Sequence, residues 1–88
     1  MAQLGADVDQ LDALARRFND VAGQIEQMVN QLGGQIHSAW WQGGDADRFR
    51  GDWDGTYRGQ LQNVCARLQE TATQVTQQAN QQRQTSQA

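Results

Sequence analysis

Apolar residues in the first half of the chain recur with the spacing of one long helix. One line of them falls every seven residues, and a second line follows it three residues later. Together they form an a/d heptad pattern over about five heptads, which predicts a helix over residues 7–41. The first line is Val8, Ala15, Ala22, Val29 and Ile36, and the second is Leu4, Leu11, Phe18, Ile25, Leu32 and Ala39.

A third apolar line widens this face. Leu14, Val21 and Met28 occupy the adjoining g positions. An a/d seam serves one neighbouring helix, whereas three adjacent lines suit a helix that contacts more than one. The third line therefore predicts a partner chain, which these three residues should reach.

A second apolar pattern predicts another helix over residues 46–80. Its mean step is close to the ~3.67 residues of an eleven-residue repeat, which favours a nearly straight helix. Three glycines early in it (Gly51, Gly55 and Gly59) allow either close packing or an irregular turn. The apolar line is Ala46, Phe49, Trp53, Tyr57, Leu61, Val64, Leu68, Ala72, Val75 and Ala79.

The segment 42–45 separates the two helices. Gly43 and Gly44 can end the first helix, and Asp45 can cap the second, as Asp7 can cap the first. Residues 1–6 are predicted to be a flexible N-terminus, and residues 81–88 a disordered Gln-rich tail. A short turn makes the helices antiparallel neighbours, so the predicted fold is an all-α, antiparallel two-helix hairpin.

The small size of the chain also favours a partner. With 88 residues it forms one domain, whose single core is marginal without further support. Cys65 is the only cysteine and His37 the only histidine, so neither an intrachain disulfide nor a metal site is expected. Cys65 is interpreted as a small buried hydrophobe, with an intermolecular disulfide as the alternative, and His37 as a solvent-facing helix residue.

The charge and composition of the chain make several classes of partner and activity improbable. The net charge is −3, and all seven basic residues are arginines, so nucleic acid is an improbable partner. No apolar run is long enough for a stable membrane span, and the N-terminus lacks the regions of a cleaved signal peptide. No nucleophile, base and orienting group can be assembled, and no cofactor motif is present, so an enzyme is not expected.

The predicted turn carries the motif Trp41-Gln42-Gly43. Glycine supplies a backbone conformation that other residues resist, and tryptophan supplies a large apolar area beside it. Because Trp40 and Trp41 point about 100° apart on a helix, they cannot both face one core. One of them is expected to be partly exposed or to meet the partner, and the sequence does not decide which.

With this motif at mid-chain between two amphipathic helices, the chain resembles the WXG family, the early-secreted-antigen-like proteins of type VII (ESX) secretion. The continuation Gly44-Asp45-Ala46-Asp47-Arg48-Phe49-Arg50, followed by Trp53, is similar to actinobacterial members. The resemblance implies a four-helix bundle of two hairpins, as a homodimer or a heterodimer with a sister protein. Its interior is expected to hold Leu11, Phe18, Ile25, Leu32, Leu61, Val64 and Leu68, with Trp53 on the buried side of the second helix.

The resemblance further implies synthesis in the cytoplasm, recognition by a secretion ATPase, and export without a cleaved signal peptide. One departure concerns the export signal Tyr-x-x-x-Asp/Glu, which many members carry after the second helix. Here the only tyrosine is Tyr57, inside that helix, and Leu61 stands four residues later. The chain is thus a signal-less member of a heterodimer or uses another signal. Two alternative functions stay open: a cytoplasmic adaptor that escorts a larger toxin, and a membrane-active effector.

Overall fold

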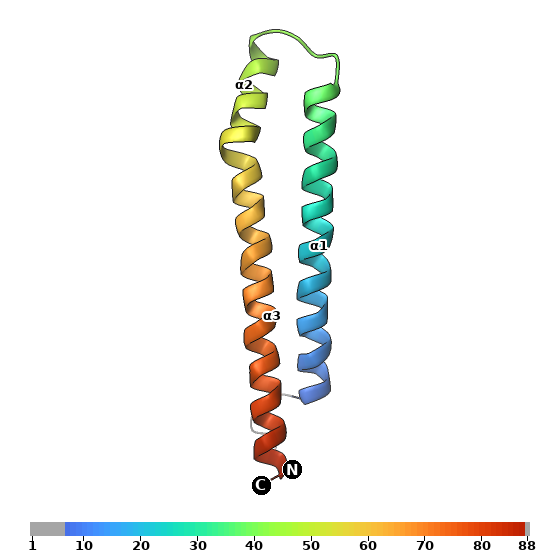
Figure 1. Cartoon of the computed structure of the whole chain (residues 1–88), viewed down its shortest axis with the longest axis vertical. Coiled ribbons are helices and arrows are strands. Elements are labelled where there is room, and N and C mark those ends of the chain that lie inside the picture. The colour runs from blue at the N-terminus through green and yellow to red at the C-terminus, as the bar shows by residue number, and fades with distance from the viewer. Residues whose placement is uncertain (1–6, 88) are drawn as a thin grey trace.

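The computed structural model describes residues 7–87 as an elongated helical hairpin of 66 × 16 × 14 Å (Figure 1). Helix α1 (Val8–Ser38) runs along one arm. The other arm contains α2 (Gly44–Asp52), a π-helical turn η1 (Trp53–Tyr57) and α3 (Arg58–Gln87). The predicted all-α hairpin is confirmed.

Both helical arms end at positions that differ from the predicted ones. Helix α1 stops at Ser38, and Ala39 is already extended (φ −66°, ψ 141°), so Trp40 and Trp41 belong to the turn. Helix α3 continues to Gln87, whereas the sequence predicted a disordered tail from residue 81. Residues 1–6, predicted to be flexible, and Ala88 lie outside the described residues.

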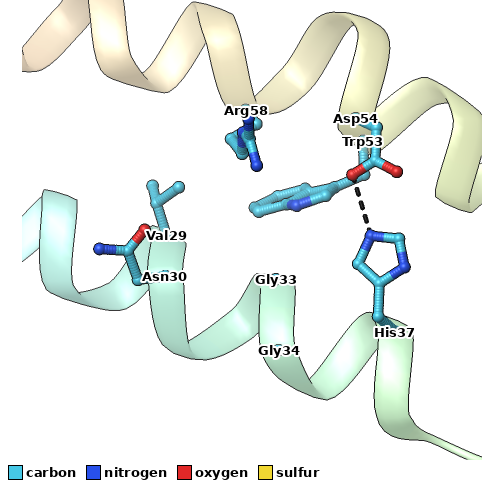
Figure 2. Close-up of a pocket in the computed structure, with 8 residues that line it drawn as sticks. All are labelled: Val29, Asn30, Gly33, Gly34, His37, Trp53, Asp54 and Arg58. Carbon is cyan, nitrogen blue, oxygen red and sulfur yellow. Dashed lines mark hydrogen bonds and ion pairs between the residues drawn. The ribbon is translucent and has the colours of Figure 1, made fainter.

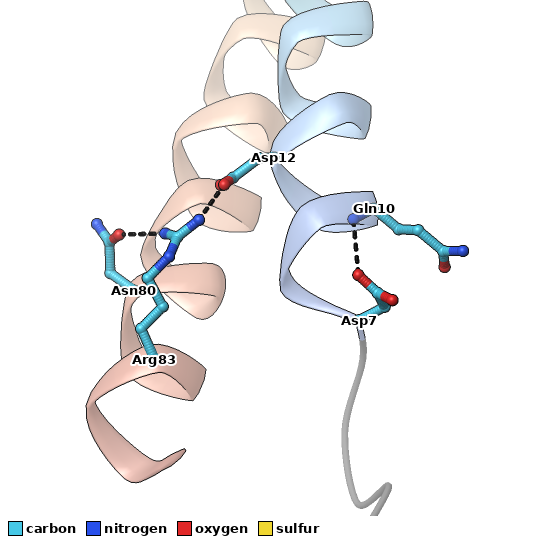
Figure 3. A network of polar contacts seen from close by, with 5 residues as sticks. All are labelled: Asp7, Gln10, Asp12, Asn80 and Arg83. Atoms are coloured by element: carbon cyan, nitrogen blue, oxygen red, sulfur yellow. Dashed lines mark hydrogen bonds and ion pairs between the residues drawn. The ribbon is translucent and has the colours of Figure 1, made fainter. Parts of the chain in front are cut away.

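Polar contacts at the open end of the hairpin explain the longer helix (Figure 3). Arg83 donates hydrogen bonds to Asp12 of α1 and, at 3.0 Å, to Asn80 of its own helix. This bridge attaches the last turns of α3 to α1, although the segment has no large apolar side chain. Nearby, the Asp7 carboxylate accepts a hydrogen bond from the Gln10 backbone N–H at 3.1 Å, so Asp7 caps α1 as predicted.

The seam between the two arms consists largely of small residues. On α1 the buried residues all belong to the first heptad line, and the second line, which was expected in the interior of a four-helix bundle, borders the seam. Small side chains let two helices approach closely, and this selects the alanine-rich line as the contact. The buried residues are Ala15, Ala22, Val29, Ile36, Ala46, Trp53, Cys65, Ala72 and Ala79.

The π turn η1 brings the buried residues of the second arm onto one side. Trp53 and Cys65 are twelve positions apart, which in an uninterrupted α-helix would separate them by about 120°. A π turn accommodates one additional residue, so the twelve positions rotate about the helix axis as eleven would. Trp53 and Cys65 are then only about 20° apart around the helix. Gly55 lies inside η1, so the irregular turn that the early glycines allow is present.

Candidate functional site

The turn that carries the Trp-x-Gly motif depends on the backbone of Gly43. Its φ of +120° is the only positive φ in the described residues, and side chains disfavour that region. Gly43 is the N-cap of α2, and its carbonyl accepts a hydrogen bond from the Asp47 N–H at 3.1 Å. The predicted cap, Asp45, is instead inside the first turn, because α2 begins at Gly44, two residues before the predicted start.

Arg50 closes this turn with three hydrogen bonds to backbone carbonyls. Its Nε donates to Ile36 at 3.0 Å, Nη1 to Trp41 at 2.9 Å and Nη2 to Ala39 at 3.0 Å. The carbonyls at the end of a helix have no partner within the helix, and a cation there is favoured by the helix dipole. Arg50 therefore terminates α1 and fixes the path of the motif.

The role of Arg50 was not predicted from the sequence. The residue was visible only as one of the charges between the aspartates that follow the motif. Its three acceptors lie nine to fourteen positions earlier in the chain, and backbone carbonyls leave no residue signature. The only local signal was an arginine in the first turns after a Trp-x-Gly segment.

The two adjacent tryptophans have different environments. Trp40 is 88% exposed, whereas Trp41 is 43% exposed and packs against Phe49 with ring centroids 6.1 Å apart. Phe49 in turn lies 6.2 Å from the ring of Tyr57, and the Arg50 guanidinium lies 5.8 Å from the centre of the Trp41 ring. Trp40 is thus the exposed member of the pair, and Trp41 begins a half-exposed aromatic row.

The predicted interface residues gather along one side of the hairpin, which we call the apolar face. Trp53 is 4% exposed in the seam, whereas Met28 is 57% and Leu32 46% exposed. An apolar groove on this face is lined by Ile25, Met28, Val29, Leu32, Trp53 and Leu61. The apolar face consists of Leu11, Leu14, Phe18, Val21, Ile25, Met28 and Leu32 of α1 with Leu61, Val64 and Leu68 of α3.

The opposite side of the seam carries polar contacts between the arms. His37 Nε2 and Asp54 Oδ1 lie 2.9 Å apart, and both side chains are half exposed. Cys65 is buried as expected, and its thiol donates a hydrogen bond to the Ala22 carbonyl at 3.4 Å. No group of three metal-ligating side chains occurs within the described residues. None of the helices described is long and apolar enough to cross a membrane.

Comparison with known proteins supports the interpretation of the turn. The family model WXG100, described as proteins of 100 residues with WXG, matches residues 3–87. Neither the curated proteins nor the solved structures gave a match. The matched range includes both arms and places Trp41 and Gly43 at the bend between them. The chain therefore belongs to the WXG100 family.

Proposed function

We propose that the protein is a secreted substrate, or the dimer partner of a substrate, of a type VII secretion system, and that it acts through protein–protein contacts. Membership of the WXG100 family supports a small secreted protein of this kind. Small helical proteins of the family are non-catalytic, in agreement with the lack of a catalytic constellation in the sequence.

The observation that carries the proposal is the apolar face, which the hairpin leaves half exposed. The seam contains five alanines (Ala15, Ala22, Ala46, Ala72 and Ala79), which bury little apolar area. The larger side chains, Phe18, Ile25 and Leu32 among them, stand beside the seam. Contiguous apolar surface on a small soluble chain marks an interaction site. A second hairpin laid against it would complete a four-helix bundle.

The direction of the two arms places their larger side chains on the same side. On α1 the line of Phe18 and Ile25 is offset from the buried line by about 60°. On α3 the line of Leu61 and Leu68 has the same offset from Cys65 and its equivalents. Because the arms are antiparallel, the two offsets point to one side, and the groove that Ile25 and Leu61 share agrees with this.

Sedimentation equilibrium tests the proposed interface. Ile25→Asp is expected to abolish the dimer, because it would bury an unpaired carboxylate. Phe18→Asp should have the same effect. Gln27→Asp, which introduces the same charge at an exposed position of α1, is the matched control and should leave the dimer intact. If the wild-type chain is monomeric by itself, the measurement is made on the complex with its sister WXG100 chain. A stable dimer of the Ile25→Asp chain would contradict the proposal.

Export is tested separately. We propose recognition by the secretion ATPase in the company of a partner chain, since Tyr57 and Leu61 do not form the Tyr-x-x-x-Asp/Glu signal. An epitope-tagged chain is expected in the culture supernatant of cells that contain the partner and the secretion system. Deleting the partner should retain the chain in the cells. Retention in both strains would instead indicate a cytoplasmic adaptor.

A further inference from the structure

A pocket of about 240 Å³ opens on the polar side of the seam, between α1 and the start of α3 (Figure 2). The buried indole of Trp53 forms its centre, and the bare backbone of Gly33 and Gly34 forms one wall. Val29, Asn30 and His37 of α1 line it with Asp54 and Arg58 of the other arm. Its α1 residues lie across the buried line from the apolar face, so a second hairpin on that face would leave the pocket open.

Polar side chains of both arms line this pocket. Figure 2 shows the Arg58 guanidinium and the Asn30 amide on the same side of the indole, with the His37–Asp54 pair on the other. Within residues 7–87 the side chain of Arg58 has neither a hydrogen bond nor an ion pair. The carboxylate of Asp54 is directed at His37, away from Arg58.

The indole N–H of Trp53 is a further donor. It donates no hydrogen bond to any described residue, although Trp53 is only 4% exposed. Every fully buried side-chain nitrogen or oxygen in the described part of the chain has a hydrogen-bond partner, so the unpaired Nε1 keeps some exposed surface. A Cβ added at Gly33 would lie 3.2 Å from Nε1. The N–H is therefore on the glycine-lined side of the pocket.

We propose that this pocket binds a carboxylate, presented by an Asp or Glu side chain of a protein that docks on the polar side of the hairpin. A guanidinium matches the two oxygens of a carboxylate, and hydrogen bonds to a charged group are about twice as strong as neutral ones. The indole N–H adds a donor, and the glycine wall admits a side chain of modest size. The pocket opens on the other side of the seam from the proposed dimer face, and the two sites share only Val29 and Trp53 of the seam.

Nuclear magnetic resonance of the ¹⁵N-labelled chain tests the proposal through the Trp53 indole resonance, assigned with Trp53→Phe. The probe is N-acetyl-glutamate methylamide, and the neutral isostere N-acetyl-glutamine methylamide is its control at matched ionic strength. The glutamate probe is expected to shift the resonance saturably, and the glutamine probe is not. Equal shifts with both probes would overturn the proposal. Acetate binding more tightly than the glutamate probe would also overturn it, because the ligand would then be a free small acid.

Two arginine variants distinguish specific binding in the pocket from nonspecific electrostatic attraction of the probe. Arg58→Gln should weaken binding of the glutamate probe by about tenfold or more, as expected for loss of a charged hydrogen bond. Arg67→Gln removes the same charge from an exposed position of α3 and should leave the affinity unchanged. Well-dispersed spectra of both variants establish that they are folded. Equal affinity of the Arg58→Gln and wild-type chains would overturn the assignment.

Discussion

The backbone of Gly33 lies against the indole of Trp53, so closely that a Cβ at position 33 would sit 3.2 Å from Nε1. Gly34, its neighbour, has nothing within 4 Å of the equivalent point. Helix α1 runs through both glycines without interruption. Gly33 accommodates the one large side chain of the seam.

Substitutions at Gly33 and Gly34 should change the free energy of unfolding in opposite directions. Gly34→Leu should raise the free energy of unfolding by up to about 1 kcal/mol, through helix propensity alone. Gly33→Leu should lower it by about 1–3 kcal/mol, because a Cβ alone would lie 3.2 Å from the buried ring and the larger side chain would overlap it. Urea denaturation followed by circular dichroism measures both values. Equal effects at the two positions would show that Trp53 does not pack against Gly33.

Replacing Arg50 should loosen the Trp-x-Gly turn. Arg50→Ala removes three hydrogen bonds to carbonyls and is expected to lower the free energy of unfolding by about 1–3 kcal/mol. Arg50→Lys should recover only part of this loss, since an ammonium cannot reproduce the planar fork. The control is Arg48→Ala, whose exposed pair with Asp45 at 3.8 Å should contribute less than about 1 kcal/mol. An Arg50→Ala loss no larger than that control would refute the role of Arg50.

The alanine seam should not tolerate larger side chains. Ala22 is fully buried opposite Cys65, so Ala22→Leu would force the arms apart and cost about 1–3 kcal/mol of stability. Ala13→Leu makes the same change on an exposed position of α1 and should be nearly neutral. Thermal unfolding of both variants gives the comparison. A neutral Ala22→Leu would mean that the arms do not meet at this line.

The hairpin could be predicted from the sequence, but the distribution of its faces could not. Heptad spacing marks three adjacent lines on α1 and does not say which one meets the other arm. Phe18 and Ile25 were predicted to fill the interior of a four-helix bundle, and the contact within the hairpin is made by Ala15 and Ala22. In a two-helix hairpin the closest approach selects small residues, and the larger ones remain for another contact.

The site was predictable as far as it depends on local conformation. The Trp-x-Gly segment indicated the turn, because Gly43 needs a backbone angle that few other residues adopt. The roles of Arg50 and of Trp53 beside Gly33 depend on contacts between the arms, which a single sequence does not record. The π turn was signalled only indirectly, by the twelve positions between Trp53 and Cys65.

The helical segment after residue 80 should depend on Arg83. Arg83→Gln removes the bond to Asp12 and is expected to lower global stability by less than about 1 kcal/mol, because the pair is partly exposed. Its local effect should be larger, since residues 81–87 have no other polar link to α1 among the described contacts. Amide hydrogen exchange across 81–87 should accelerate severalfold in Arg83→Gln and stay unchanged in Arg67→Gln. Unchanged exchange in Arg83→Gln would mean that this end of α3 is held by helix propensity rather than by the bridge.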